Sequence, residues 1–172
     1  TKWGALGMSV RYGYIDATFQ SAFAENSPSN STADENGTIQ VNPGNRIPAI
    51  PQHSAKLRLD YDVSSRWSLG ANVVYSGSTY ARGDENNRDI GGKVPGYTVV
   101  NLDTRYNVAK GLELFARVNN LFDKRYSNFG ILGENFFNGP HHTFDPDNAA
   151  MEQFRGVGAP RGAWAGVRYA WL

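Results

Sequence analysis

Tyr97-Thr-Val-Val-Asn-Leu-Asp-Thr-Arg-Tyr-Asn-Val108 is followed by the turn Ala109-Lys110-Gly111 and by a second stretch of similar pattern that runs to Tyr126. In the first arm the even positions from 100 to 108 are mostly apolar, whereas positions 101 to 107 alternate with them as polar or charged residues. A period of two indicates a β-strand, and two such stretches around a short turn indicate a hairpin. One face of this hairpin is apolar and the other is charged.

The turn predicts the register of this hairpin, because a shift of one residue would move every side chain to the other face. A three-residue turn leaves Gly111 in the left-handed conformation that such turns need. The predicted cross-strand pairs are Val108 with Leu112, Tyr106 with Leu114 and, on the polar face, Asp103 with Arg117.

The same alternation recurs elsewhere and brings the expected number of strands to six. The other four strands are predicted at about 3–23, 55–63, 67–80 and 161–172. The first begins at Trp3, and its parity switches at Ile15, which indicates a bulge or an exit from an apolar layer. A three-residue turn at 64–66 predicts four apolar pairs, Leu57 with Val73, Leu59 with Ala71, Tyr61 with Leu69 and Val63 with Trp67.

The remaining segments, about 24–52, 81–96 and 127–160, are polar and are predicted to be long loops. Short turns at one end of the strands and long loops at the other are typical of outer-membrane barrels. Aromatic residues are expected near both ends of the strands, as in the girdles of such barrels. Those near the short turns are Tyr61, Trp67, Tyr106, Tyr169 and Trp171, and those near the long loops are Tyr75 and Tyr97.

The composition favours an all-β fold and excludes several classes of function. Among 172 residues there are 19 Gly, 8 Pro and 22 aromatic residues, and no long window has helical spacing of apolar residues. A net charge of +1 gives no electrostatic case for a nucleic-acid partner. There is no cysteine, and no run of eighteen apolar residues that would form a transmembrane helix. A mean hydropathy of −0.49 still permits barrel strands, which expose only alternate side chains to lipid.

A soluble β-sandwich, for example a carbohydrate-binding module, is the alternative that parity alone leaves open. Two features disfavour it. Lys56, Arg58, Asp60 and Asp62 on one polar face suit a wet or protein-filled lumen, and the small residues Ala71, Ala116, Ala163 and Ala165 on the apolar faces would make a thin core.

Four segments resemble motifs of the TonB-dependent outer-membrane receptors, in family order and from about Gly4 onward. The first is similar to the "NLFDKRY" signature of that family, and the others resemble the strand entry before it, the return from an external loop and the closing strand. They are Val118-Asn-Asn-Leu-Phe-Asp-Lys-Arg-Tyr126, Val94-Pro-Gly-Tyr-Thr-Val-Val-Asn-Leu102, Ile47-Pro-Ala-Ile-Pro-Gln-His-Ser-Ala-Lys-Leu57 and Ala159-Pro-Arg-Gly-Ala-Trp-Ala-Gly-Val-Arg-Tyr169.

The resemblance implies that residues 1–172 are the C-terminal part of a 22-stranded antiparallel transmembrane β-barrel in a Gram-negative outer membrane, with short periplasmic turns and long extracellular loops. It implies TonB-coupled uptake of a scarce nutrient, most often a ferric siderophore. The implied partners are the remaining strands and plug domain with its TonB box, the TonB complex, membrane lipid and lipopolysaccharide, and the barrel-assembly machinery. That machinery reads a terminal aromatic, for which Trp171 is the candidate.

Five loop residues are candidates for contact with an anionic, partly aromatic ligand such as a ferric chelate, because guanidinium groups and ring faces suit both properties. They are Arg82, Arg88, Phe136, Phe137 and His142. Asp103 and Arg117 are expected to form an ion pair that lines the lumen.

Neither a metal site nor an enzymatic site is expected. His141 and His142 near Asp145, Asp147 and Glu152 match no metal-ligand spacing, and the acidic run at 84–89 lacks the spacing of a calcium loop. The sequence contains no recognisable arrangement of Ser, His and Asp, of paired carboxylates or of a phosphate-binding loop. The sequence therefore predicts a protein that is not an enzyme and has no cofactor.

Overall fold

The chain folds as an all-β structure. The computed structural model describes residues 4–171. The strands of that part are β1 (Leu6–Tyr14), β2 (Phe23–Asn26), β3 (Thr38–Val41), β4 (His53–Asp62), β5 (Trp67–Ser76), β6 (Tyr97–Ala109), β7 (Leu112–Asn119), β8 (Ser127–Asn135), β9 (Ala150–Val157) and β10 (Gly162–Tyr169), with short 3-10 turns η1 (Pro140–His142) and η2 (Pro146–Asn148). No helix within residues 4–171 is long and apolar enough to cross a membrane.

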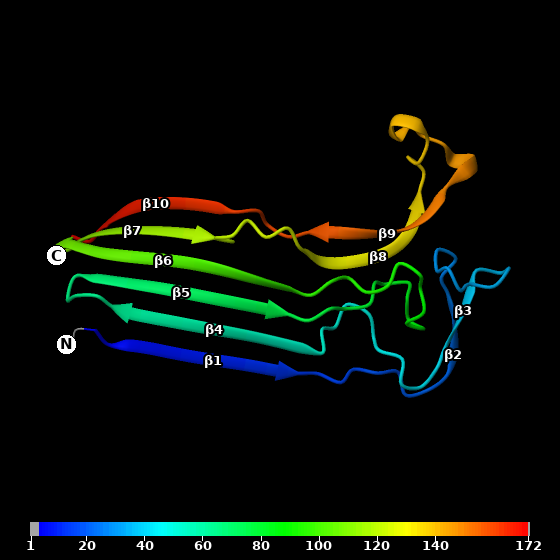
Figure 1. The fold of residues 1–172 in the computed structure, drawn as a ribbon, viewed down its shortest axis with the longest axis horizontal. Helices are drawn as coiled ribbons and strands as arrows, with labels where there is room; N and C mark the ends of the chain where they lie inside the picture. Colours follow the sequence, from blue (N-terminus) through cyan, green and yellow to red (C-terminus); the bar gives the residue numbers. More distant parts are fainter. Residues whose placement is uncertain (1–3, 172) are drawn as a thin grey trace.

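Six strands form one antiparallel sheet in the order β1-β4-β5-β6-β7-β10. Figure 1 shows them side by side, with both ends of the chain and the short turns at one end of the sheet and the three long connections at the other. We call these connections loop 1 (residues 15–52), loop 2 (77–96) and loop 3 (120–161). The predicted six-stranded arrangement and its uneven connections are therefore confirmed.

The predicted register is confirmed in both short-turn hairpins, with one exception. The pairs Leu57–Val73, Leu59–Ala71 and Tyr61–Leu69 are all present, as are Tyr106–Leu114 and Asp103–Arg117. Val63 and Trp67 follow the same register but lie beyond the last pair of β4 and β5, Asp62 with Ser68. The pair Val108–Leu112 is wrong, because Ala109 lies opposite Leu112 and the register shifts between Asn107 and Ala109. The connection is thus one residue tighter than expected, a bulge takes up the extra residue, and Gly111 has the predicted positive φ, of 77°.

The long strands are shorter than predicted at their loop ends. β1 ends at Tyr14, where the parity switches, rather than near Phe23, and β5 ends at Ser76 rather than near Tyr80. Just beyond these points the backbone makes only isolated bridges, Thr18 with Arg46 and Thr79 with Val94, so alternation no longer indicates a continuous strand. Trp3 and Leu172, the expected outer ends of the first and last strands, lie outside the described residues.

The three loops are more ordered than their composition suggested. Loop 1 contains the β2–β3 hairpin and loop 3 contains the longer β8–β9 hairpin. The polar segment 24–52, predicted to be a loop, nevertheless contains two buried apolar side chains, because Ile39 and Val41 are only 1% and 0% exposed. A short apolar pair within a polar run is enough to anchor a small hairpin against neighbouring loops.

The buried apolar side chains lie mostly in the loops and not on the sheet. They are Ile39, Val41, Ala81, Val94, Val99 and Leu132. Along the strands, by contrast, large apolar side chains such as Met8, Val10 and Val167 are more than half exposed. Within residues 4–171 the six-stranded sheet is a single layer, which contradicts the β-sandwich alternative.

Candidate functional site

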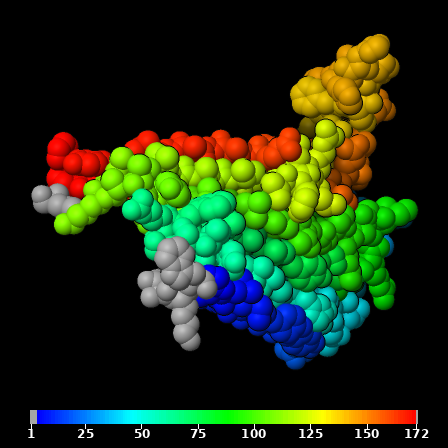
Figure 2. All heavy atoms as spheres, turned by 60° about the vertical axis from the view of Figure 1, so that its left-hand side comes forward, coloured from blue at the N-terminus to red at the C-terminus, as the bar shows by residue number. Residues whose placement is uncertain are grey.

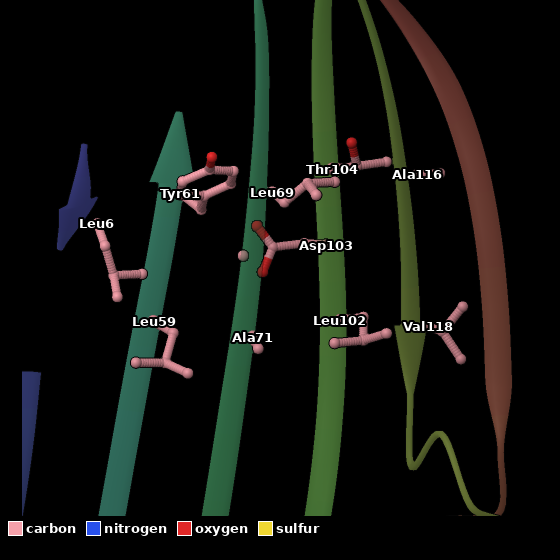
Figure 3. A pocket seen from close by; sticks show the side chains of 11 residues that line it. Leu6, Leu59, Tyr61, Leu69, Ala71, Leu102, Asp103, Thr104, Ala116 and Val118 are labelled. Carbon is pink, nitrogen blue, oxygen red and sulfur yellow. The ribbon is translucent and has the colours of Figure 1, made fainter. Parts of the chain in front are cut away.

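The apolar face of the sheet is continuous across all six strands. The paired registers align Met8, Leu59, Ala71, Leu102, Val118 and Ala163 in one row. Figure 3 shows four of these side chains in line, with a second row that includes Leu69 and Ala116 beside them. The small alanines between leucines leave a shallow hollow of about 440 Å³. An apolar face of this extent, exposed along β-strands, is the surface that a barrel presents to lipid.

Aromatic residues lie at the short-turn end of this face, as predicted. Trp67 is opposite Tyr106, and its indole N–H donates to the Thr104 hydroxyl at 2.9 Å. Tyr169 and Trp171 contact edge to face with 4.7 Å between ring centroids. Trp171 itself is 87% exposed.

Of the two aromatic residues expected on the apolar face near the long loops, only one lies there. Tyr75 is on the apolar face, but Tyr97 pairs with Ser76 and so has the parity of the polar face. Its ring packs against the ring of Tyr126 in a tilted arrangement, with centroids 4.3 Å apart. The odd position of Tyr97 in its strand already carried this information, and the expectation overlooked it.

The polar face contains an ion-pair network that crosses a strand. Arg58 on β4 pairs with Asp60 at 2.5 Å and, across β5, with Asp103 on β6. Gly70 lies between them, and a Cβ atom there would overlap the guanidinium of Arg58 and the carboxylate of Asp103. The missing side chain at Gly70 is therefore what lets the two charged groups meet.

Asp103 and Arg117 are opposite each other, as the register predicted. Their expected ion pair is nevertheless not among those of residues 4–171, because Asp103 pairs with Arg58. Arg117 instead lies against the ring of Trp164, with its Cζ atom 5.9 Å from the centroid. A planar guanidinium over an indole face is a favourable cation–π arrangement.

Two aromatic side chains on this polar face were missed by the sequence analysis. Phe115 packs over Gly166, where an added Cβ would overlap its ring, and Trp164 lies beside Arg117. Both share their parity with charged residues, which was the signal that could have identified them. Together with Arg105 and Arg168 they line a recess of about 430 Å³.

The family-like segment 118–126 forms a tight turn held by Asn120, which is 3% exposed. The amide of Asn120 donates to the carbonyl oxygens of Lys124 and Ala159, each at 3.0 Å, and its side-chain oxygen accepts from the Lys124 N–H at 2.8 Å. Its own N–H donates to the side chain of Asn101 at 2.8 Å. One asparagine thus ties the end of β7 to β6 and to the entry of β10.

Loops 1 and 2 are joined by buried polar side chains. The hydroxyl of Ser27 and the amide of Asn30 both donate to the carbonyl of Gly83, at 2.7 and 2.9 Å. The amide of Asn86 donates to the hydroxyl of Thr32 at 2.8 Å. Ser27, Asn30 and Asn86 are at most 6% exposed, so these hydrogen bonds are shielded from water.

Asp84 organises loop 2 from within. Its side chain is fully buried, and its Oδ1 accepts the backbone N–H groups of Arg88 and Asp89 at 2.8 and 2.9 Å. Its Oδ2 has no hydrogen-bond partner among the described residues. Burial disfavours the charged carboxylate and raises the pKa of Asp84, although the two N–H donors oppose this effect.

Loops 2 and 3 pair through their backbones. The N–H of Arg82 donates to Gly130 at 2.9 Å and its carbonyl accepts from Leu132 at 2.8 Å. Ala81, Val94 and Leu132 form a small buried apolar cluster at this junction. Loop 2 therefore lies between the other two, and the three form one packed unit that we call the loop layer.

The tip of loop 3 projects beyond this layer, as the yellow and orange part of Figure 2 shows. The ring of Phe144, a residue that the sequence analysis did not include, contacts the rings of Phe136 and Phe137. The distances between ring centroids are 6.3 Å to Phe136 and 5.5 Å to Phe137. His142 is exposed and has a positive φ of 58°. Of the five predicted contact residues, the structure thus groups Phe136 and Phe137 at the tip, near His142 in sequence.

The two predicted arginines, Arg82 and Arg88, belong to the loop layer instead. Both side chains are exposed, whereas their backbones are fixed by Gly130, Leu132 and Asp84. The loop histidines and acids near position 142 do not assemble into a metal site. Within the described range 4–171, no group of three or more His, Asp or Glu could hold a metal ion.

The chain is similar to known receptors in sequence. A family model described as "TonB dependent receptor-like, beta-barrel" matches residues 1–121. The probable TonB-dependent siderophore receptor PiuA of Acinetobacter baumannii is 40% identical over 83 residues, covering 48% of this chain and 10% of that protein. The metal-pseudopaline receptor CntO of Pseudomonas aeruginosa is 33% identical over 115 residues, covering 67% and 14%. The chain therefore spans a small part of these relatives.

Solved structures show the same fold. The siderophore receptor PiuA from Acinetobacter baumannii superimposes with a TM-score of 0.68 at 23% identity, over 95% of this chain and 19% of that one. The ferric yersiniabactin uptake receptor FyuA from Yersinia pestis gives 0.54 at 20% identity, over 75% and 18%. The apolar and polar faces of the sheet, its uneven connections and the family match over residues 1–121 lead to one conclusion: this chain belongs to the TonB-dependent receptor-like β-barrel family.

Proposed function

We propose that this chain supplies the C-terminal strands and loops of an outer-membrane receptor that takes up a ferric siderophore with energy relayed by TonB. The observation that carries the proposal is the two-faced sheet. Its apolar face spans six strands and is not covered by other residues of the described part of the chain, and its opposite face carries charges and aromatic rings. This is the arrangement of a wall between lipid and a polar lumen.

The similarity to receptors whose names specify siderophores supports the choice of ligand class. The relative named for metal-pseudopaline widens it to other metal chelates. In this proposal the barrel has 22 strands and encloses a plug domain that contacts the TonB complex. Lipid and lipopolysaccharide cover the apolar face, and the barrel-assembly machinery recognises the terminal aromatic Trp171.

The proposed contacts for the ligand are of two kinds. Arg82 and Arg88 present positive charge from the ordered loop layer, and the tip of loop 3 presents Phe136, Phe137 and His142. Ferric chelates combine negative charge with apolar or aromatic surface, and arginine and aromatic side chains bind such ligands well. The fixed backbone of loop 2 would hold the arginines in place while the tip reaches outward.

The test is uptake by cells that express the receptor as its gene encodes it, in a host without its own siderophore receptors. Radiolabelled iron is supplied as catecholate, hydroxamate, carboxylate and opine-type chelates, with and without a functional TonB. We expect TonB-dependent uptake of one of these classes. The same low uptake of every chelate in the presence and absence of TonB, with the receptor shown to be in the outer membrane, would contradict the proposal.

Site variants then separate binding from assembly. Replacing both Arg82 and Arg88 with Gln is expected to raise the half-saturating chelate concentration about tenfold, which corresponds to about 1.4 kcal/mol. Arg66 and Lys110, in the two short turns at the other end of the sheet, provide a matched control, since the double change Arg66→Gln and Lys110→Gln also removes two positive charges but far from the loops. Equal effects of the two changes would assign the loss to overall charge and not to ligand contact.

A further inference from the structure

Two positive side chains lie directly opposite each other on the polar face. Arg11 on β1 is the cross-strand partner of Lys56 on β4, and both are exposed. Like charges at directly opposed positions of an antiparallel pair destabilise the sheet. A negative charge nearby would offset this repulsion.

The described residues do not supply that charge. The ion pairs within residues 4–171 are Arg58 with Asp60, Arg58 with Asp103 and Arg168 with Glu113, and they include neither Arg11 nor Lys56. The two cations border a hollow of about 410 Å³. Its lining has no acidic residue and consists of Ser9, Arg11, Lys56, Arg58 and Asn72.

We propose that this hollow binds the carboxylate of an Asp or Glu side chain on polypeptide that packs against the polar face. The inference rests on the proposed barrel, in which that face lines an interior, but not on the proposed ligand. Arginine and lysine offer only N–H donors, and a carboxylate can accept from both at once. Ser9 and Asn72 add neutral donors at the rim of the same hollow.

A carboxylate fixed in the protein fits the observations better than a carboxylate on a transported ligand. The opposition of Arg11 and Lys56 is permanent, so it destabilises the sheet for as long as the hollow is empty. A ligand in transit would occupy the hollow only briefly. A side chain of the protein would offset the repulsion throughout the life of the fold, and we therefore assign the hollow to a structural partner.

The sign of a mutational effect distinguishes these cases. If a carboxylate occupies the hollow, Lys56→Gln removes an attraction and should lower the Tm of the ligand-free receptor in detergent by about 2 °C. If the hollow is empty or holds only a transient ligand, the same change relieves a repulsion, and an unchanged or raised Tm would overturn the inference. Lys56→Arg should keep the wild-type Tm, and Lys110→Gln in the exposed turn controls for loss of charge.

A zero-length carbodiimide crosslink identifies the partner. Coupling joins the Lys56 amine to a carboxylate only when they are in contact, and mass spectrometry of the full-length receptor then shows which Asp or Glu is joined. We expect a link from Lys56 to an acidic residue outside residues 4–171 that is lost in Lys56→Arg. Absence of any Lys56 link, with other lysines coupled, would contradict the proposal. A receptor that fails in uptake but forms this link would refute the transport proposal alone.

Discussion

Gly70 is the residue whose lack of a side chain matters most for the polar face. It leaves the gap through which Arg58 reaches Asp103 across β5. The ion pair would be unremarkable between adjacent strands, but here it clamps β4 to β6 over the strand between them. A charged pair that is partly shielded by the sheet contributes more than one in open water.

We expect Gly70→Ala to destabilise the sheet by about 1–3 kcal/mol, because the new methyl group must displace one of the two charged side chains. The measurement is the unfolding temperature of the receptor. It is the temperature at which the folded barrel loses its distinct mobility in SDS gels. Ser68→Ala, on the same strand and the same face, is the control and should behave as wild type. Equal unfolding temperatures of Gly70→Ala and wild type would refute the claim that the missing side chain at Gly70 lets Arg58 reach Asp103.

We expect Asp84 to make the loop layer sensitive to pH. Its folded-state pKa is raised by burial, so the folded loops favour the protonated carboxyl. The contribution to stability is then greatest at acid pH and is lost as the pH rises from the ordinary aspartate value, about 3.9, through the raised value. Amide hydrogen exchange of residues 83–90 measures this directly in the native receptor.

We expect greater protection of these amides at low pH than at neutral pH after correction for intrinsic exchange. Asp84→Asn keeps an acceptor for the N–H groups of Arg88 and Asp89 and removes the charge. In this variant the amides of residues 83–90 should therefore be protected equally at low and at neutral pH. Asp84→Ala leaves the Asp89 N–H without its acceptor and the Arg88 N–H with only the longer bond to Asn86 at 3.2 Å, so these amides should lose protection at both pH values. A pH dependence that persists unchanged in Asp84→Asn would assign the effect to another group.

Single-residue roles were the hardest part to predict from sequence. The left-handed Gly111 could be predicted because a turn is local. The roles of Gly70, Asp84 and Asn120 depend on groups far away in the chain, such as Asp103 for Gly70 and Ala159 for Asn120. Asp103 shows the same limit, since its position opposite Arg117 followed from the register but its partner Arg58 did not.

At the scale of elements, the short-turn hairpins were predictable and the loops were not. Alternation over 8 to 13 residues fixes which face of a strand is apolar, and a short turn then fixes the register. β2 and β3 have only four residues each, too few for a period to be visible. Ile39 and Val41 of β3 are nevertheless at most 1% exposed, and that burial depends on other segments of the chain.

The tip of loop 3 is held by its own aromatic cluster. Phe144→Ala removes the ring that gathers Phe136 and Phe137, an interaction worth about 0.5–1.5 kcal/mol for each aromatic pair. We expect faster hydrogen exchange at 136–144 and unchanged exchange in β6 and β7. Phe122→Ala, another exposed phenylalanine outside the cluster, is the matched control. Faster exchange throughout β8 and β9 would instead show that the tip supports the whole hairpin.

At the scale of the whole molecule, the sheet has edges at β1 and β10 and an apolar face that other described residues do not cover. Unpaired strand edges cannot remain exposed in a hydrocarbon layer. The proposed barrel resolves both features, because further strands pair with the edges and lipid covers the apolar face. The loop layer, where the buried apolar residues lie, then forms the outer rim.

The central claim is that this sheet separates lipid from a polar interior, and alternating accessibility along β5 tests it most directly. The chain has no cysteine, so single cysteines at Ala71, Asn72 and Val73 can each carry a nitroxide label without background labelling from this chain. In membranes containing the full receptor, we predict that oxygen, which concentrates in lipid, relaxes the labels at 71 and 73 most strongly. The label at 72 should show low oxygen accessibility. Equal accessibility at all three positions, or the opposite alternation, would contradict the account.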